Sequence, residues 1–301
     1  MQAQAWPAGG NCSIINESVD SSFQGIQAGL LLGSEENPAN NREVGMSATG
    51  LRIAEADGIV EVTIDRPPVN ALARSTYLEI AQVFSSFRDQ PDVRVVILTG
   101  AGERAFCAGR DIKDLSIERA EGPIANVGDP YHLTREAFWA VRHCAVPVIC
   151  AVNAAAIGAG LALVAVSDIA IASQRATFAL AEIDVGVLGA ASFAKWMVGP
   201  GRARRMFYTG EHVTAAEVHR LGGVDSVVPH ERLMDEARGL AANIAAKDPI
   251  AIRMAKASVV RTDTLPLEQA YQTEQDYTQH LSGYGASAAA IERFATSTTP
   301  G

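Results

Sequence analysis

The stretch PVICAVNAAAIGAGLALVAVSDIAIAS, residues 147–173, decides the fold. It is long and apolar enough to suggest a membrane-spanning helix, but the polar residues Asn153 and Asp168 interrupt it. We therefore interpret residues 148–152 and 168–172 as buried strands with a helix between them. Strands that are covered on both faces read as continuous apolar runs, as these two do. Such an alternation predicts an α/β core with crossover connections.

The residues on either side extend this pattern. The run VRVVILTG, residues 93–100, predicts another buried strand that ends in glycine, and alternating apolar positions predict a strand over 59–64. Apolar residues at helical spacing over 77–87 predict an amphipathic helix. Three-to-four spacing near the end of the chain, with prolines at first-turn positions, predicts helices over 230–247, 249–262 and 266–281.

The chain is predicted to have three parts. Residues 1–48 lack sustained periodicity and contain clusters of turn-forming and acidic residues, so we expect a disordered N-terminal extension. This extension has no secretory signal pattern, and Met46 is a candidate natural start. Residues 49–228 are expected to form the core domain, and residues 229–301 a helical module that packs on it or on a neighbouring subunit.

The composition argues against several classes of function. The 301 residues carry a net charge of −9 without any run of Lys or Arg, so neither nucleic acid nor a membrane surface is an expected partner. The cysteines form no CxxC pair and have no His at metal-ligand spacing, which argues against a metal site and a disulfide framework. We expect free thiols in the cytoplasm at Cys12, Cys107, Cys144 and Cys150.

Three segments combine small residues with the ends of predicted elements. FCAGRDIK, residues 106–113, follows the VVILTG strand, and NAAAIGAGL, residues 153–161, follows the VICAV strand. Because their residues are small, each segment lets the backbone N–H groups at the N-terminus of a helix come close to a ligand. AEIDVGV, residues 181–187, places Glu182 and Asp184 on one face if the segment is an extended strand. Taken singly, none of them indicates a function. Most segments like the first are only turns, the second also fits close helix packing through small residues, and a Glu in a loop is usually a solvated surface group or a cap.

Together, these segments resemble the enoyl-CoA hydratase/isomerase, or crotonase, superfamily. The resemblance rests on VTIDRPPVNAL, VVILTGAGERAFCAGRDIKDL, PVICAVNAAAIGAGLALVAVSDIAIAS, FALAEIDVGV and GPGRARRMFYTG, and it extends from Leu51 to Phe294. It implies a crotonase-like α/β spiral of ββα units, with a C-terminal helical module used in trimerisation and assembly as a homotrimer or hexamer. It also implies an acyl-CoA thioester substrate, with coenzyme A as part of the substrate and no separate cofactor.

The resemblance implies roles for particular residues. The backbone N–H groups of Arg110 and Ala159 match the oxyanion hole that binds a thioester enolate, Ala159 taking the middle place of the family's GGG segment. Glu182 matches one catalytic carboxylate of the family's hydratases, whereas Ala162 stands where they carry the other. The positions that match the coenzyme A channel are Val69, Ala108, Asp111, Ile112 and Lys113.

The missing carboxylate bears on the reaction. Hydration of a conjugated double bond is easiest with two acid/base groups, each contributing roughly 10²–10⁴-fold, whereas single-acid isomerases of this family shift a double bond with one. We therefore expect isomerase-like proton transfer through Glu182, with Asp184 as an auxiliary acid or a structural residue. A C–C hydrolase, a decarboxylase and a catalytically silent acyl-CoA-binding protein stay open. Lys113 is explained equally well as a solvated helix residue.

Overall fold

The computed structural model describes residues 42–44, 50–114 and 132–284, which form two sheets and a set of covering helices. The strands are β1 (Arg42–Val44), β2 (Leu51–Ala56), β3 (Ile59–Ile64), β4 (Val95–Gly100), β5 (Ala105–Cys107), β6 (Val148–Val152), β7 (Ala155–Ile157), β8 (Ile169–Ser173), β9 (Thr177–Ala179), β10 (Val213–Thr214) and β11 (Ser226–Val228). The helices are α1 (Arg74–Ser86), α3 (His132–Arg142), α4 (Ala159–Val166), α5 (Ala191–Thr209), α6 (Ala215–Arg220), α7 (Leu233–Ala245), α8 (Pro249–Thr262) and α9 (Leu267–Ser282). Short 3-10 helices are η2 (Phe87–Asp89), η3 (Ala181–Val185) and η4 (His230–Arg232).

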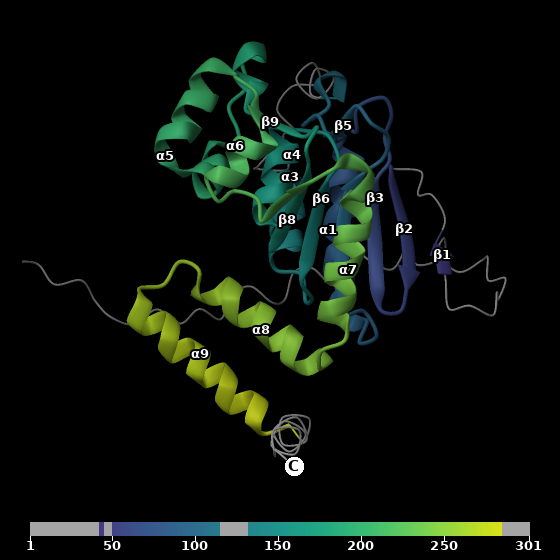
Figure 1. The fold of residues 1–301 in the computed structure, drawn as a ribbon, viewed down its shortest axis with the longest axis vertical. Coiled ribbons are helices and arrows are strands. Elements are labelled where there is room, and N and C mark those ends of the chain that lie inside the picture. Colours follow the sequence, from purple (N-terminus) through teal and green to yellow (C-terminus); the bar gives the residue numbers. More distant parts are fainter. Residues whose placement is uncertain (1–41, 45–49, 115–131, 285–301) are drawn as a thin grey trace, which may run out of the picture. The chain divides into compact units, whose positions relative to one another are not determined.

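The chain repeats one supersecondary unit (Figure 1). In β4-β5-α3, β6-β7-α4 and β8-β9-α5, the first strand joins a seven-stranded sheet of order β1-β2-β3-β4-β6-β8-β11. The second strand joins a four-stranded sheet of order β10-β9-β7-β5. Successive first strands pair in parallel, and so do successive second strands. This repetition confirms the predicted spiral of ββα units. Strand β1 lies inside the stretch that we predicted to be an extension, and it pairs with β2.

The seven-stranded sheet is covered on both faces, which explains why its central strands are apolar at every position. Alternate residues such as Val95 and Ile97 pack under α7, in a cluster that includes Leu233 and Ala237. The intervening residues, such as Val96, belong to the main core with α1, α3 and α4. Helix α4 contributes buried side chains all round, as its apolar sequence predicts.

Residues 147–173 contain the two predicted strands and the predicted helix, together with a short strand, β7, that was not predicted. Strand β6 covers residues 148–152 and β8 covers 169–173, with β7 and α4 between them. Among the residues that the structure describes, no helix is both long and apolar enough to cross a membrane.

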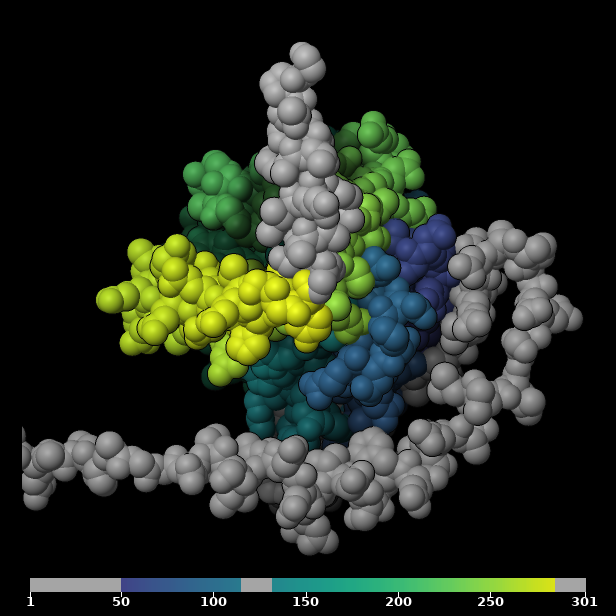
Figure 2. Space-filling view, turned by 90° about the horizontal axis from the view of Figure 1, so that it is seen from below, coloured from purple at the N-terminus to yellow at the C-terminus, as the bar shows by residue number. Residues whose placement is uncertain are grey.

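The predicted C-terminal helices are confirmed as α7, α8 and α9. Asp248 caps α8 because its carboxylate accepts hydrogen bonds from the N–H groups of Ile250 and Ala251, at 3.0 and 2.9 Å. Helix α9 packs along α8 and exposes large apolar side chains, with Leu267 87% and Tyr271 60% exposed. Figure 2 shows α8 and α9 as a band, in the last colours of the bar, across one face of the surface.

Candidate functional site

The first half of the candidate site is the segment that follows β5. The N–H of Leu72 donates to the carbonyl of Gly109 at 2.7 Å, and the N–H of Asp111 donates to the carbonyl of Leu72 at 2.9 Å. These bonds form a parallel bridge between Leu72 and Arg110. Because the peptide groups on either side of Arg110 make the bridge, the N–H of Arg110 points to the opposite side of the segment.

The second half is the start of α4. Its first residue is Ala159, whose N–H has no acceptor within the helix because it belongs to the first turn. The two halves touch at Gly109: a Cβ there would lie 3.0 Å from the carbonyl oxygen of Ile157 and 3.7 Å from the nitrogen of Ala159. Gly109 also has a φ of +95°, which side chains rarely adopt. Glycine therefore lets the two backbone segments meet.

Glu182 joins these halves through Gly158. Its carboxylate lies against the Cα of Gly158, so that a Cβ there would overlap Oε1 and lie 2.6 Å from Cδ. The carboxylate is thus beside the peptide that carries the N–H of Ala159. Its Oε2 atom is buried and accepts no hydrogen bond from the described residues. Burial raises the pKa of the Glu182 carboxyl above its usual range, so the carboxylate is a stronger base than an exposed one.

Asp184 does not share this position. Residues 181–185 form the 3-10 helix η3 and not a strand, so side chains two residues apart differ by roughly 240° around the axis. The carboxylate of Asp184 lies near Gly210, where a Cβ would be 2.9 Å from Oδ2, and the residue is exposed. The expectation that Glu182 and Asp184 share one face is wrong, because the segment is helical.

Ala162 lies one turn into α4, where its N–H donates to the carbonyl of Gly158 at 3.0 Å. None of its surface is exposed, and it packs in the main core. The position that we matched to the other carboxylate of the family's hydratases is therefore apolar and packed against the core.

Asp111 braces the first half of the site. Its carboxylate pairs with Arg66 at 2.8 Å and accepts a hydrogen bond from the N–H of Lys113 at 3.0 Å. Burial by itself would raise the pKa of Asp111. The hydrogen bonds from Arg66 and from the N–H groups of Lys113 and Asp114 outweigh it and lower that pKa. Asp111 therefore stays ionised and ties the 66–72 segment to the Arg110 segment.

The other residues predicted for the coenzyme A channel lie along the same two segments. Val69 and Ala108 are half-buried and joined by a backbone hydrogen bond of 3.0 Å. Ile112 is 56% exposed and Lys113 is also exposed. Ala108, Ile112 and Lys113 thus lie within three residues of Arg110 in the chain, and Val69 is bonded to the same segment through Ala108.

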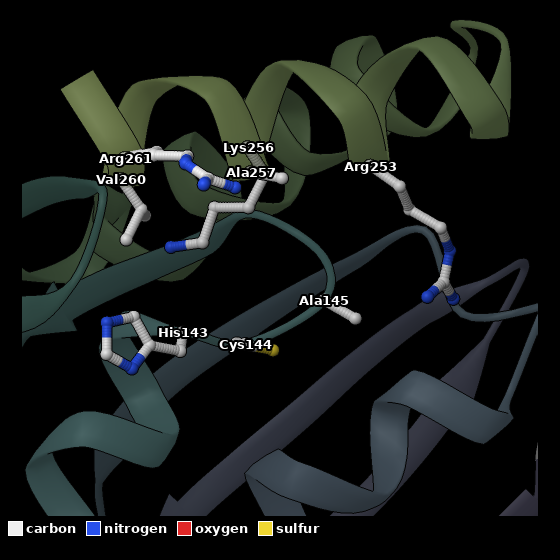
Figure 3. A pocket seen from close by; sticks show the side chains of 8 residues that line it. All are labelled: His143, Cys144, Ala145, Arg253, Lys256, Ala257, Val260 and Arg261. Atoms are coloured by element: carbon white, nitrogen blue, oxygen red, sulfur yellow. The ribbon is translucent and has the colours of Figure 1, made fainter. Parts of the chain in front are cut away.

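A separate pocket of about 460 Å³ lies between α8 and the connection from α3 to β6. Figure 3 shows Lys256 and Arg261 of α8 above His143 and Cys144 of that connection. The pocket is at the beginning of β6, whereas the segment with Ala159 follows the end of β6. Glu182 does not line it, so it is not part of the candidate site.

Other chemistry-bearing side chains are not gathered into a second centre in the described residues. No group of three or more His, Cys, Asp or Glu side chains there lies close enough together to hold a metal ion. Cys107, Cys144 and Cys150 are buried thiols, and burial raises the pKa of each. Cys12 lies outside the described residues.

We did not single out Arg66, Asn70 or Asn153 as supports of the site from the sequence. Asn153 stood out only as a polar residue that interrupts an apolar stretch, and Arg66 and Asn70 appeared only within the VTIDRPPVNAL segment of the family resemblance. Their partners lie up to 51 residues away, so no local pattern could identify them.

Comparison with known proteins agrees with this architecture. Residues 54–298 match the family described as Enoyl-CoA hydratase/isomerase. A protein of Rhodococcus jostii (strain RHA1), named (7aS)-7a-methyl-1,5-dioxo-2,3,5,6,7,7a-hexahydro-1H-indene-carboxyl-CoA hydrolase, is 41% identical over 77% of this chain and 89% of its own. Carnitinyl-CoA dehydratase of Escherichia coli (strain K12) is 36% identical over 74% of this chain and 84% of its own. The crystal structure of an enoyl-CoA hydratase from Bacillus anthracis superposes with a TM-score of 0.75, at 29% identity, over 84% of this chain and 98% of that one.

Proposed function

Since the chain belongs to the enoyl-CoA hydratase/isomerase family and acts on acyl-CoA, we propose that Arg110 and Ala159 hold a thioester enolate through their N–H groups while Glu182 carries the proton. One observation carries this proposal: the Glu182 carboxylate rests on Gly158, next to the Ala159 N–H, with a buried oxygen that accepts no hydrogen bond from the described residues. A base and an oxyanion donor that are neighbours can act on adjacent atoms of one substrate.

The two N–H groups supply the larger part of the catalysis. Negative charge develops on the thioester oxygen when the α-proton leaves, and each preorganised donor contributes about 10²–10³-fold to the rate. The raised pKa of Glu182 brings its basicity closer to that of the substrate, which favours proton transfer. Because the donors belong to the backbone, Ala159 can serve in place of the family's glycine.

The first candidate reaction is a double-bond shift in a 3-enoyl thioester. Glu182 removes the α-proton, and the electron pair of that bond moves into the thioester to form a dienolate in the oxyanion hole. The protonated Glu182 then returns the proton to the γ-carbon, which yields the conjugated 2-enoyl thioester. One carboxylate completes this cycle, in keeping with the filled, apolar position of Ala162.

The second candidate is hydrolysis of a carbon–carbon bond in a β-oxo acyl-CoA, and the name of the 41% identical relative favours it. Glu182 takes a proton from water as the hydroxide adds to the ketone. The bond between that carbon and the α-carbon then breaks, and its electron pair forms the thioester enolate. Glu182 returns the proton to the α-carbon, so this cycle also needs one carboxylate.

A panel of thioesters tests the proposal. The purified protein is incubated with a 3-enoyl-CoA, a 2-enoyl-CoA and a cyclic β-oxo acyl-CoA, and the products are identified by mass and by the conjugated-thioester absorbance. Isomerisation leaves the mass unchanged, whereas ring cleavage adds one water and keeps coenzyme A attached. Hydration of the 2-enoyl thioester that outpaces both reactions and survives Glu182→Gln would overturn the proposal.

We propose a homotrimer or hexamer in the cytoplasm that needs no separate cofactor. The exposed apolar residues of α8 and α9, including Val259, Leu267 and Tyr271, support burial against a neighbouring subunit. Sedimentation velocity on the full chain tests this, and a monomer at micromolar concentration would contradict it.

A further inference from the structure

The two halves of the oxyanion hole are connected by the pairing of β5 with β7, which contains a register shift. Ala105 of β5 pairs with Ala155 of β7, but Cys107 pairs with Ala156, so Phe106 is an extra residue on β5. A bulge of this kind re-aims the chain beside a site, and it also interrupts the ladder that would fix the register. Strands of three residues each leave little further pairing to hold Arg110 opposite Ala159.

Asn153 connects the two halves directly. It follows β6 and precedes β7, so it belongs to the chain segment that leads to Ala159. Its Nδ2 donates to the carbonyl oxygen of Gly102 at 2.7 Å, in the turn that leads to β5 and Arg110. Asn153 is only 6% exposed, and its Oδ1 accepts no hydrogen bond from the described residues. Replacing Asn153 by alanine therefore removes the side-chain hydrogen bond to Gly102.

Asn70 holds the same turn from another direction. Its Nδ2 donates to the carbonyl oxygens of Ala101 and Ala105, both at 2.9 Å, and its Oδ1 accepts from the N–H of Arg66 at 3.0 Å. The side chain is buried, and the backbone has a φ of +54°. Both ends of the 101–105 turn are therefore clamped before the chain enters the bulged strand.

We propose that Asn70 and Asn153 are positioning residues that fix the register of the Arg110 N–H against the Ala159 N–H. The inference rests on the proposed function, because it concerns the same oxyanion hole. A slip by one residue moves a strand by about 3.3 Å, and misplacement by about 1 Å already costs roughly 10²-fold in rate. The two asparagines thus contribute to the transition state through geometry and not through contact with substrate.

The test uses a spectroscopic signature that is independent of turnover. 4-(Dimethylamino)cinnamoyl-CoA has a push–pull chromophore, and hydrogen bonds to its thioester oxygen shift its absorbance to longer wavelength. The probe is bound to wild-type protein and to Asn153→Ala, and kcat is measured with whichever thioester the wild type turns over. Thr99→Val is the matched control, because Thr99 is as buried as Asn153 and its Oγ1 donates to the carbonyl of Ala151 at 2.8 Å and not to a carbonyl of the turn.

In Asn153→Ala, we expect the red shift of the bound probe to shrink and kcat to fall about 10- to 100-fold, while Kd for the probe changes less than about threefold. Thr99→Val should lose a similar amount of stability and keep both the red shift and kcat. Asn70→Ala should reproduce the Asn153→Ala result. If Asn153→Ala does not fold, Asn153→Ser serves instead, since its hydroxyl is too short to reach Gly102.

The outcomes separate the two proposals. A wild-type protein that binds the probe without a red shift would show that no oxyanion hole acts on the thioester, and the proposed function would fail with it. A wild-type red shift that Asn153→Ala and Asn70→Ala retain in full, with kcat equal to that of Thr99→Val, would overturn the positioning role alone.

Discussion

Two carboxylates of this chain have opposite hydrogen-bonding environments. Asp168, which precedes β8, has both oxygens on the Nζ of Lys256 at 2.6 and 2.7 Å, and it also accepts from the N–H of Val148 at 2.7 Å. Glu182, which follows β9, has a buried oxygen that no described residue satisfies. The first region attaches helix α8 to the sheet, and the second leaves a carboxylate oxygen without a partner among the described residues. Full hydrogen bonding marks Asp168 as the structural carboxylate, and the incomplete hydrogen bonding of Glu182 supports the proton-transfer role that we propose for it.

The sharpest contrast comes from Glu182→Gln. The amide keeps the shape of the side chain but accepts no proton, so kcat should fall by about 10²–10⁴-fold with little change in acyl-CoA affinity. Asp184→Asn is the matched control, and it should keep most of the activity because Asp184 faces Gly210. Steady-state rates and a binding titration measure both quantities. An active Glu182→Gln together with an inactive Asp184→Asn would assign the proton to Asp184 instead.

The structural carboxylate should respond in stability and not in rate. Lys256→Met keeps the apolar stem but leaves Asp168 without its cation, which should lower the free energy of unfolding by about 3–5 kcal/mol. The kcat of the folded fraction should stay within about twofold. Urea unfolding measures the first quantity, with the exposed Lys195→Ala as control. An unchanged unfolding midpoint would mean that the ion pair does not anchor α8.

The pH dependence should come from Glu182. Since its pKa is raised in the folded state, folding favours the protonated form, and that stabilisation is present at low pH and lost as pH rises through the folded pKa. Glu182→Gln should therefore gain stability relative to wild type as pH rises toward neutrality. The kcat of the wild type should rise as pH rises, because Glu182 must be ionised to act as a base. The acid limb of kcat should lie above the usual pKa of glutamate; a limb at or below it would contradict the burial effect.

A smaller effect is expected where the chain enters α5. Ala190 has a φ of +56°, a left-handed conformation that is costly for any residue with a Cβ. Ala190→Gly should relieve this strain and, after the extra freedom of glycine in the unfolded chain, stabilise the protein by roughly 0.5–1 kcal/mol. Ala191→Gly, inside the helix, should destabilise it instead. Thermal unfolding of the two variants should shift in opposite directions; matching shifts would remove the strain argument.

The sequence predicted the parts of the fold that depend on long apolar patterns. Strand β3 and helices α7, α8 and α9 have clear periodicity, and strands β4, β6 and β8 are continuous apolar runs, so both patterns located these elements. The four-stranded sheet did not, because its strands of two or three residues are too short to show a period. The η3 helix was mistaken for a strand for the same reason, since five residues fit either pattern.

The candidate site was predictable in its small residues and not in its supports. Resemblance to a family marked Arg110, Ala159 and Glu182, and the structure brings all three segments together. The hydrogen bonds of Asn153 and the ion pair of Lys256 join residues 51 and 88 positions apart, and no local spacing encodes such pairs. Contacts of this range become visible only when the crossover connections are traced in space.

The buried thiols allow local unfolding near the candidate site to be measured. A thiol reagent reacts with an accessible thiolate, and Cys107 and Cys144 are both almost fully enclosed, with pKa values raised by burial. Each thiol can be labelled only when its surroundings unfold transiently, so its labelling rate measures how often that region opens. Cys107 lies in β5, in the segment that leads to Arg110, whereas Cys144 lines the distant pocket beside α8. An acyl-CoA that binds at the proposed oxyanion hole should slow the labelling of Cys107 and leave the labelling rate of Cys144 unchanged.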